Sequence, residues 1–164
     1  TGAAAARWLA DVYAVGLAHG ITPQHWAWVT ALPDACWDVR RDDLDYDLLR
    51  RLVAQLRDVQ PLYLGDYYPL TPYSLNDDVW LAWQFDRPDE GRGVVQAFRR
   101  PKSTQETVRC RLRGLDAQAT YVVRDLDVPD KSTELAGREL AEQGLSITIP
   151  NRPGAAVVTY QRKP

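Results

Sequence analysis

The spacing of apolar residues changes from helical to strand-like near residue 65. The clearest helical pattern covers residues 48–60, where apolar side chains recur three and four positions apart. These apolar positions are Leu48, Leu49, Leu52, Val53, Leu56 and Val59. Asp42 or Asp43 can cap this helix, and Pro61 ends it because proline has no backbone N–H to donate. The pattern predicts a helix with one face that must be covered by other residues.

Two weaker patterns precede this helix. Residues 3–17 are rich in alanine and carry a short apolar stripe, which predicts a helix that ends near Gly16. Residues 21–37 mix prolines and tryptophans without a clean period. They are therefore predicted to form either a packed connector or a short helix that starts after Thr22.

Strand-like alternation begins at residue 79 and predicts a strand with one apolar inner face. The inner face carries Val79, Leu81, Trp83 and Phe85, and the opposite face carries Trp80, Ala82 and Gln84. Residues 86–93 supply the Pro, Asp and Gly that tight turns need, and residues 93–100 have the pattern of a returning strand. The sequence thus predicts a β-hairpin.

Shorter alternating runs follow at intervals typical of an antiparallel sandwich. In residues 108–113 apolar side chains alternate with three arginines, which predicts a sheet with one solvent-exposed face. Further strand-like runs cover residues 120–126, 145–149 and 155–160. Residues 132–144 are predicted to form one short helical turn. The predicted fold class is α+β, with N-terminal helices in residues 1–64 followed by an antiparallel β-sandwich in residues 65–164.

Composition and charge narrow the class of protein. The chain has 164 residues, a mass of 18.6 kDa and a net charge of −2, from 20 basic and 22 acidic residues. Because these charges are interspersed, we do not expect a nucleic-acid partner. Arg7 and Asp11 interrupt the apolar N-terminal run, so we expect neither a membrane span nor a signal peptide there. The widely separated Cys36 and Cys110 are expected to be buried free thiols.

Two short patterns are similar to chemical motifs, and neither is complete. Asp43, Asp45 and Asp47 alternate as calcium-loop ligands do, but the glycine and the final carboxylate of such a loop are absent. An acidic helix N-terminus, which the helix dipole favours, explains them better. His19 and His25 have no accompanying nucleophile motif. No catalytic residue and no metal site are therefore predicted.

Aromatic residues cluster where the two structural periods meet. They are Tyr63, Tyr67, Tyr68, Tyr73, Trp80 and Trp83. Flat aromatic rings can stack on sugars, although filling a core is their commoner role. Trp80 stands opposite the predicted inner face, so it either packs under the preceding helix or is exposed for binding. Asp77 and Asp78 point to opposite sides of a strand, which does not suit two carboxylates acting on one sugar bond.

Two stretches are more distinctive. They are Gly65-Asp-Tyr-Tyr-Pro-Leu and Arg113-Gly-Leu-Asp-Ala-Gln-Ala-Thr-Tyr. Read with Trp37-Asp-Val-Arg-Arg and Asp78-Val-Trp-Leu-Ala-Trp-Gln-Phe-Asp-Arg, they make residues 36–160 resemble the C-terminal region of α-galactosidases of glycoside hydrolase family 36. The first stretch is similar to that family's G-D-[FY]-Y-x-L link, and the second to its L-K/R-G-L-D-x-x-x-x-Y turn.

The resemblance implies a place within a larger enzyme. In that family the helix before the link closes a catalytic (β/α)₈ barrel, and the residues after it form an antiparallel β-sandwich packed against the barrel. The family cleaves α-galactosides with retention, using two aspartates upstream of this region, so we expect the isolated chain to be inactive. The resemblance puts Trp37 and Asp38 near the end of the last barrel strand. We expect these two residues, and Trp80, to contact substrate, and we expect no cofactor.

Three functions remain open. In the first case, the chain is a C-terminal supporting domain of an α-galactosidase-like glycoside hydrolase, with the catalytic barrel of the parent chain as its partner. Alternatively, it is a stand-alone carbohydrate-binding module that uses Trp80 and the nearby tyrosines to bind an α-galactoside or oligosaccharide. In the third case it is a structural partner that completes the barrel of another chain. An exposed helix face in residues 48–59 would also favour a homo-oligomer, and no compartment is predicted.

Overall fold

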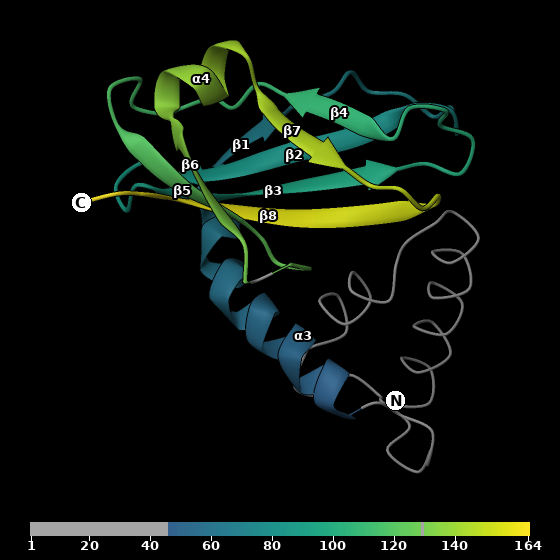
Figure 1. Cartoon of the computed structure of the whole chain (residues 1–164), viewed down its shortest axis with the longest axis horizontal. Coiled ribbons are helices and arrows are strands. Elements are labelled where there is room, and N and C mark those ends of the chain that lie inside the picture. The colour runs from purple at the N-terminus through teal and green to yellow at the C-terminus, as the bar shows by residue number, and fades with distance from the viewer. Residues whose placement is uncertain (1–45, 129) are drawn as a thin grey trace. The chain divides into compact units, whose positions relative to one another are not determined.

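The computed structural model describes residues 46–128 and 130–164, which are coloured in Figure 1. The chain divides into two compact units, Thr1–Asp58 and Val59–Pro164. The second unit consists mostly of antiparallel strands in two sheets, with a hydrophobic core between them, and is therefore β-sandwich-like. The predicted helix at residues 3–17 and the predicted connector at residues 21–37 lie outside the described residues.

The helix predicted for residues 48–60 is present as α3, Tyr46–Val59. A 3₁₀ helix, η1, follows directly at Gln60–Leu64 and contains Pro61 near its start. The proline ends the α-helical ladder, because a proline inside an α-helix removes a hydrogen bond, whereas in the first turn of a new helix that bond is not needed. The chain then turns at Gly65, whose N–H donates to the Leu62 carbonyl over 2.9 Å.

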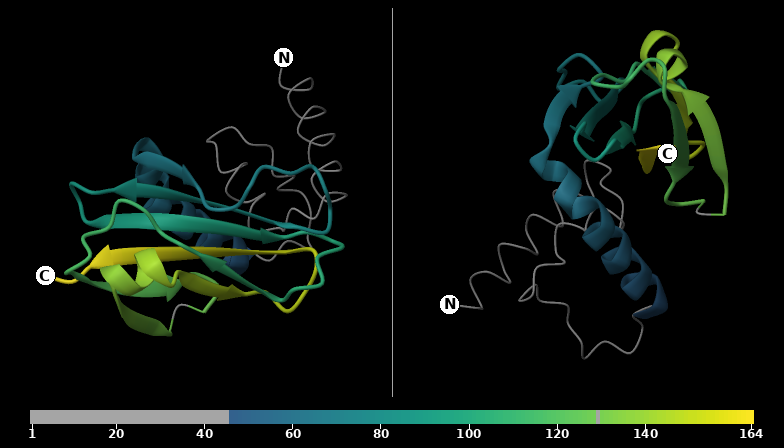
Figure 2. Two further views of the ribbon diagram at one scale, coloured as in Figure 1. Left: turned by 90° about the horizontal axis from the view of Figure 1, so that it is seen from above. Right: turned by 90° about the vertical axis from the view of Figure 1, so that its left-hand side faces the viewer.

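The larger sheet has six strands in the order β1-β2-β3-β8-β5-β6. Its strands are β1 Asp66–Pro69, β2 Trp80–Arg87, β3 Arg92–Arg99, β5 Thr120–Asp125, β6 Ser132–Ala136 and β8 Gly154–Arg162. The smaller sheet pairs β4, Thr107–Cys110, with β7, Leu145–Thr148. A short helix, α4, covers Gly137–Glu142. The β4–β7 pair lies over one face of the larger sheet (Figures 1 and 2).

The predicted hairpin is confirmed. Strands β2 and β3 pair antiparallel from Trp80 opposite Arg99 to Arg87 opposite Arg92. The turn between them includes Gly91, whose φ of +61° lies in the left-handed region that glycine adopts at little cost. Strand β8 pairs with β3 on one side and with β5 on the other, so the C-terminal strand lies inside the sheet.

The prediction of which face of β2 is buried is wrong. Along β2 the buried side chains are those of Trp80, Ala82, Gln84 and Asp86, whereas Leu81, Trp83, Phe85 and Arg87 are half-buried. Alternation along one strand gives the two faces but not which of them meets the second sheet. Here β4 and β7 cover the face with the polar residues, and hydrogen bonds satisfy Gln84 there.

The later strands do not all pair with their neighbours in the sequence. The run at residues 108–112 does not pair with the run that follows it at residues 120–126, because β4 pairs with β7 instead. Two strands were not predicted: β1, and β6 within residues 132–144, where only a helical turn was expected. Both are edge strands with largely exposed side chains. Their sequences therefore lack the alternation of apolar and polar residues that predicts a strand.

A single cluster of buried side chains fills the space between the sheets. Its members are Trp80, Ala82, Val95, Ala97, Cys110, Leu112, Tyr121, Val123, Leu140, Leu145, Ile147, Ile149, Ala156, Val158 and Tyr160. Cys110 is a buried free thiol, as predicted, whereas Cys36 lies outside the described residues. Burial raises the pKa of the Cys110 thiol to about 11. Among the described residues, no helix has the length and apolar character needed to cross a bilayer.

Candidate functional site

The structure places one of the three predicted substrate-binding residues. Trp80 is 7% exposed and belongs to the core, where its indole N–H donates to the Gln105 carbonyl over 3.0 Å. A sugar cannot stack on a ring that is enclosed by core side chains, so the alternative of an exposed Trp80 does not fit this structure. Trp37 and Asp38 lie outside the described residues, and their role stays a prediction.

Several other aromatic residues, Tyr63, Tyr67, Trp83, Phe85 and Phe98, gather on the opposite face of the six-stranded sheet. We call this the outer face and define it by Leu81, Trp83, Phe85, Gln96 and Phe98. The rings of Trp83 and Phe98 are 4.8 Å apart, and Phe85 lies 5.0 Å from Tyr63 and 5.4 Å from Tyr67. Because four of the five defining side chains are only half-buried, this face has apolar area left to cover.

A polar chain of hydrogen bonds crosses the outer face. The Trp83 indole donates to the Gln96 side-chain oxygen over 2.6 Å, and the Gln96 amide donates to the Tyr63 hydroxyl over 3.2 Å. Burial raises the pKa of Tyr63 to about 12, so this hydroxyl stays protonated at physiological pH. These hydrogen bonds fix the orientation of the Trp83 and Tyr63 rings, because the polar group of each ring has a partner.

The inner side of the same sheet contains a buried carboxylate. Asp86 is 2% exposed, and its Oδ1 accepts a hydrogen bond of 2.6 Å from the Tyr160 hydroxyl. That hydroxyl in turn accepts from the Gln84 amide over 2.7 Å. Gln84 also exchanges two hydrogen bonds with the backbone of Arg113, of 2.8 and 2.9 Å. We call Gln84, Asp86 and Tyr160 the Asp86 cluster.

The second carboxylate oxygen of Asp86 has no hydrogen-bond partner among the described residues. Burial raises the pKa of Asp86, since removing water disfavours the charged form. The Tyr160 hydrogen bond acts in the opposite direction, and the nearby charges of Asp66 and Asp89 add to the increase. Burial, followed by the hydrogen bond to Asp86, also raises the pKa of Tyr160. Tyr160 is therefore the donor in this pair.

Three glycines make room for the cluster. A Cβ on Gly65 would stand 2.1 Å from the Asp86 carbonyl oxygen, and one on Gly114 would stand 2.5 Å from Asp86 Oδ2. A Cβ on Gly93 would stand 2.1 Å from the Tyr160 hydroxyl, which lies opposite it in the sheet. Each distance is far below a normal contact, so a side chain at any of these positions would displace the cluster. Gly114 also has a φ of +75°, which disfavours other residues.

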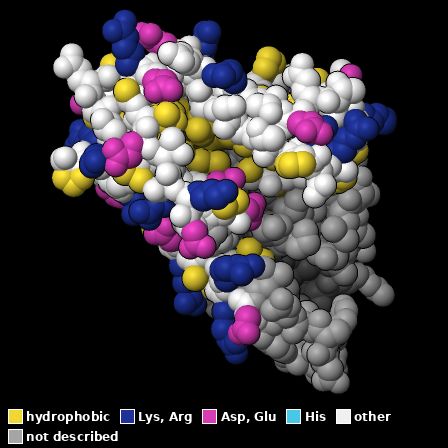
Figure 3. Space-filling model, viewed as in Figure 1, with side chains coloured by type: hydrophobic (Ala, Val, Ile, Leu, Met, Phe, Trp, Pro, Cys, Tyr) yellow, Lys and Arg dark blue, Asp and Glu magenta, His cyan; other side chains and the backbone are white. Residues whose placement is uncertain are grey.

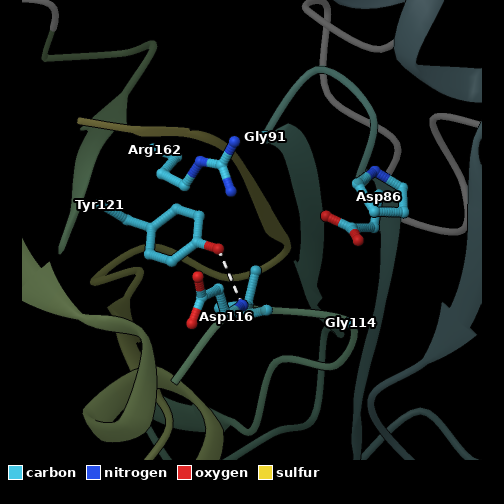
Figure 4. A pocket seen from close by; sticks show the side chains of 8 residues that line it. Asp86, Gly91, Gly114, Asp116, Tyr121 and Arg162 are labelled. Atoms are coloured by element: carbon cyan, nitrogen blue, oxygen red, sulfur yellow. Dashed lines mark hydrogen bonds between the residues drawn. The ribbon is translucent and has the colours of Figure 1, made fainter. Parts of the chain in front are cut away.

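A pocket of about 270 Å³ lies beside the cluster (Figure 4). Its walls come from the hairpin turn, the 114–116 turn and the strands β5 and β8. The lining residues are Asp86, Pro88, Gly91, Gly114, Leu115, Asp116, Tyr121 and Arg162. In Figure 4 the carboxyl group of Asp86 points toward the space that the Arg162 guanidinium and the Tyr121 hydroxyl also face. The pocket is polar on several sides.

The sequence analysis did not predict this site, although some of its residues belong to the two distinctive stretches. Gly114, Leu115, Asp116 and Tyr121 belong to one of the two distinctive stretches, and Gly65 belongs to the other. Both stretches meet Asp86, which the hairpin strand supplies. The missing signal is the pairing of β3 with β8, because that contact brings Tyr160 to Asp86 across 74 positions of sequence.

Comparison with protein families places a known domain in the second unit. Residues 80–160 match the model of the glycosyl hydrolase family 36 C-terminal domain. These residues form a family 36 C-terminal domain. The matched region begins with β2 and ends within β8, so it includes the Asp86 cluster and most of the residues that line the pocket. No curated protein matches the sequence.

Solved structures of family 36 α-galactosidases have the same fold. The α-galactosidase AgaA from Geobacillus stearothermophilus matches 87% of this chain with a TM-score of 0.67 and 19% identity. The α-galactosidase from Lactobacillus brevis matches 84% with a TM-score of 0.65 and 15% identity. The galactosidase domain of the α-galactosidase-sucrose kinase AgaSK matches 76% with a TM-score of 0.61 and 19% identity. The chain covers 20%, 20% and 17% of these three proteins, so it spans at most a fifth of their length.

Within the described part of the chain, no three metal-binding side chains gather in one place. Of the incomplete calcium-loop pattern, the structure describes only Asp47, which pairs with Arg50 at 2.7 Å on the exposed side of α3. Acidic and basic side chains are intermixed on the face that Figure 3 presents.

Proposed function

We propose that this chain is the C-terminal supporting part of an α-galactosidase-like glycoside hydrolase whose catalytic aspartates lie outside these residues. The observation that carries the proposal is the family 36 C-terminal domain at residues 80–160. Its support is the likeness in fold to α-galactosidases of which this chain covers 20% of the length. In the parent protein, retaining cleavage of α-galactosides would take place on a barrel, and this domain would stabilise that barrel.

The outer face is the surface that fits such a partner. It carries half-buried aromatic and aliphatic side chains, and their polar tips are already satisfied by hydrogen bonds within the face. Covering it with the catalytic domain of the parent would bury this apolar area at about 25 cal/mol per Å². In this proposal residues 1–64, for which the sequence predicts helices, contribute the end of the barrel.

Two finer expectations belong to the same proposal. Trp37 and Asp38, placed by resemblance near the end of the last barrel strand, would contact an α-galactoside bound by the parent. The apolar surfaces of the chain would also allow the parent to assemble as a homo-oligomer. The stand-alone carbohydrate-binding module built on Trp80 is not proposed, because Trp80 is enclosed in the core.

The native size of the protein tests this proposal. An antibody raised against the 164-residue chain would be used on extracts of the source cells, with α-galactosidase activity measured across the same size fractions. We expect a band several times larger than 18.6 kDa that co-elutes with hydrolysis of a chromogenic α-galactoside. A single band at 18.6 kDa would overturn the proposal, since the catalytic residues would then be missing.

A further inference from the structure

The pocket beside the Asp86 cluster has in its wall a buried polar atom without a partner in the described part of the chain. Asp86 Oδ2 is a buried acceptor without a donor among the described residues. Leaving a buried carboxylate oxygen unpaired destabilises a fold, so such atoms call for an explanation. The Gly114 turn stands directly beside this oxygen and is exposed on its other side. A donor from a bound molecule could reach Oδ2 after a small shift of that turn.

Other groups in the pocket add both donors and acceptors. The Arg162 guanidinium offers several N–H donors and lines the pocket next to Gly91. Asp116 uses Oδ1 to accept the Gln118 N–H over 2.9 Å, and its carboxylate borders the same space. The Tyr121 hydroxyl accepts the Asp116 N–H over 2.9 Å and keeps its own proton for donation. Leu115 and Pro88 supply the apolar contacts.

These groups exclude several classes of ligand. An anion would face two carboxylates, from Asp86 and Asp116, against a single guanidinium. A divalent cation would be repelled by Arg162, and no cluster of three metal-binding side chains exists among the described residues. A neutral molecule with many hydroxyl groups suits the pocket, because each hydroxyl can donate to a carboxylate and accept from a guanidinium or phenol. The pocket volume of about 270 Å³ is just below the roughly 300–1,000 Å³ of drug-sized sites, which favours a small ligand.

We propose that this pocket binds a small neutral polyhydroxyl molecule of monosaccharide size, held by Arg162 and Asp116 at the entrance and by Asp86 at the inner wall. The inference goes beyond the supporting role and does not depend on it, because every lining residue lies within Val59–Pro164. A domain could stabilise a barrel with this pocket empty, and it could bind a sugar here without any barrel.

The test is a titration of the ¹⁵N-labelled 164-residue chain, followed by amide chemical shifts. The probe is D-galactose, and inorganic phosphate and calcium chloride are titrated in parallel. We expect saturable shifts of the Gly91, Gly114 and Tyr121 amides with galactose. Saturation with phosphate or calcium in place of galactose would overturn the inference, and so would the absence of any saturable change at these three amides.

Two variants connect the binding to the proposed groups. Arg162→Ala keeps the backbone hydrogen bond between its N–H and the Gly91 carbonyl, and Asp116→Asn keeps an acceptor for the Gln118 N–H. Each should weaken galactose binding about tenfold, as expected when a hydrogen bond to a charged group is lost. Arg109→Ala removes an exposed arginine that does not line the pocket and is the matched control. Equal affinities for all three variants would place the sugar elsewhere and overturn the assignment.

Discussion

Asp86 shows at the residue scale how a polar side chain is accommodated in an apolar interior. Tyr160 supplies a hydrogen bond to one oxygen, Gln84 orients Tyr160, and the absence of a side chain at Gly114 leaves room for the carboxyl group. A buried carboxylate is costly unless it is paired, so the surrounding residues are constrained as strictly as those of the hydrophobic core.

Removing the Tyr160 hydroxyl should destabilise the domain. Tyr160→Phe leaves Asp86 Oδ1 without its donor and takes one acceptor from the Gln84 amide. Because the groups left behind are buried, we expect the free energy of unfolding to fall by about 1–3 kcal/mol. Urea unfolding followed by tryptophan fluorescence measures this, with Tyr73→Phe, at a residue 85% exposed, as the control. Equal unfolding midpoints for the two variants would mean that the hydrogen bond has no net value.

The same carboxyl group should make stability depend on pH. Its pKa in the folded state is raised, mainly by burial, above the value of about 3.9 for an unperturbed aspartate. The folded state therefore binds a proton more tightly than the unfolded state, and the contribution of Asp86 to stability is largest below about pH 4. That contribution is lost as the pH rises through the folded-state pKa. We expect the free energy of unfolding of the wild type, minus that of Asp86→Asn, to fall between acid and neutral pH. A difference that rises with pH, or stays constant, would contradict the assigned direction.

At the element scale, the sequence predicted those features that depend on neighbouring residues. The helix α3, the stop at Pro61 and the β2–β3 hairpin all follow from local periods and turn residues. The inner face of β2 was predicted wrongly, because the second sheet, which decides the face that is buried, is built from distant residues. The edge strands β1 and β6 escaped prediction because exposed strands lack a buried face.

The short helix η1 allows a direct comparison of two leucines that are two positions apart. Leu62 is 1% exposed and Leu64 is 85% exposed. Leu62→Ala should leave a cavity and lower the free energy of unfolding by about 2–5 kcal/mol. Leu64→Ala should change it by less than about 0.5 kcal/mol, as surface substitutions usually do. Thermal or urea unfolding of the two variants checks this prediction. Similar losses of unfolding free energy for both would contradict the burial of Leu62 and the exposure of Leu64.

At the scale of the whole molecule, the candidate site depends on contacts that local patterns do not encode. The 114–116 turn, the end of β2 and the end of β8 meet only when the sheet is complete. The two distinctive stretches pointed to this region through Gly65, Gly114 and Tyr121, but Asp86 appeared in the sequence only as a polar residue near a turn. Its partner Tyr160 appeared as one more strand residue, and the pairing of β3 with β8 gave both of them a role.

A substitution on the outer face tests the supporting role, because it should destabilise the proposed parent more than the isolated chain. Leu81 is half-buried on this face, opposite Phe98 in the sheet. If the catalytic domain covers it, Leu81→Gln would bury a polar amide without a partner in the parent, at a cost of about 1–3 kcal/mol. In the isolated chain the amide can reach water, so the cost should be smaller.

The measurement is the midpoint of thermal inactivation of the parent, compared with the unfolding midpoint of the 164-residue chain, each with and without Leu81→Gln. Ser146→Gln, at an exposed position of β7, is the control and should leave both midpoints unchanged. We expect the loss in the parent to exceed the loss in the isolated chain, because only the parent would cover the outer face. Equal losses would indicate that the outer face stays open to solvent, and the catalytic domain would then have to contact another surface of this domain.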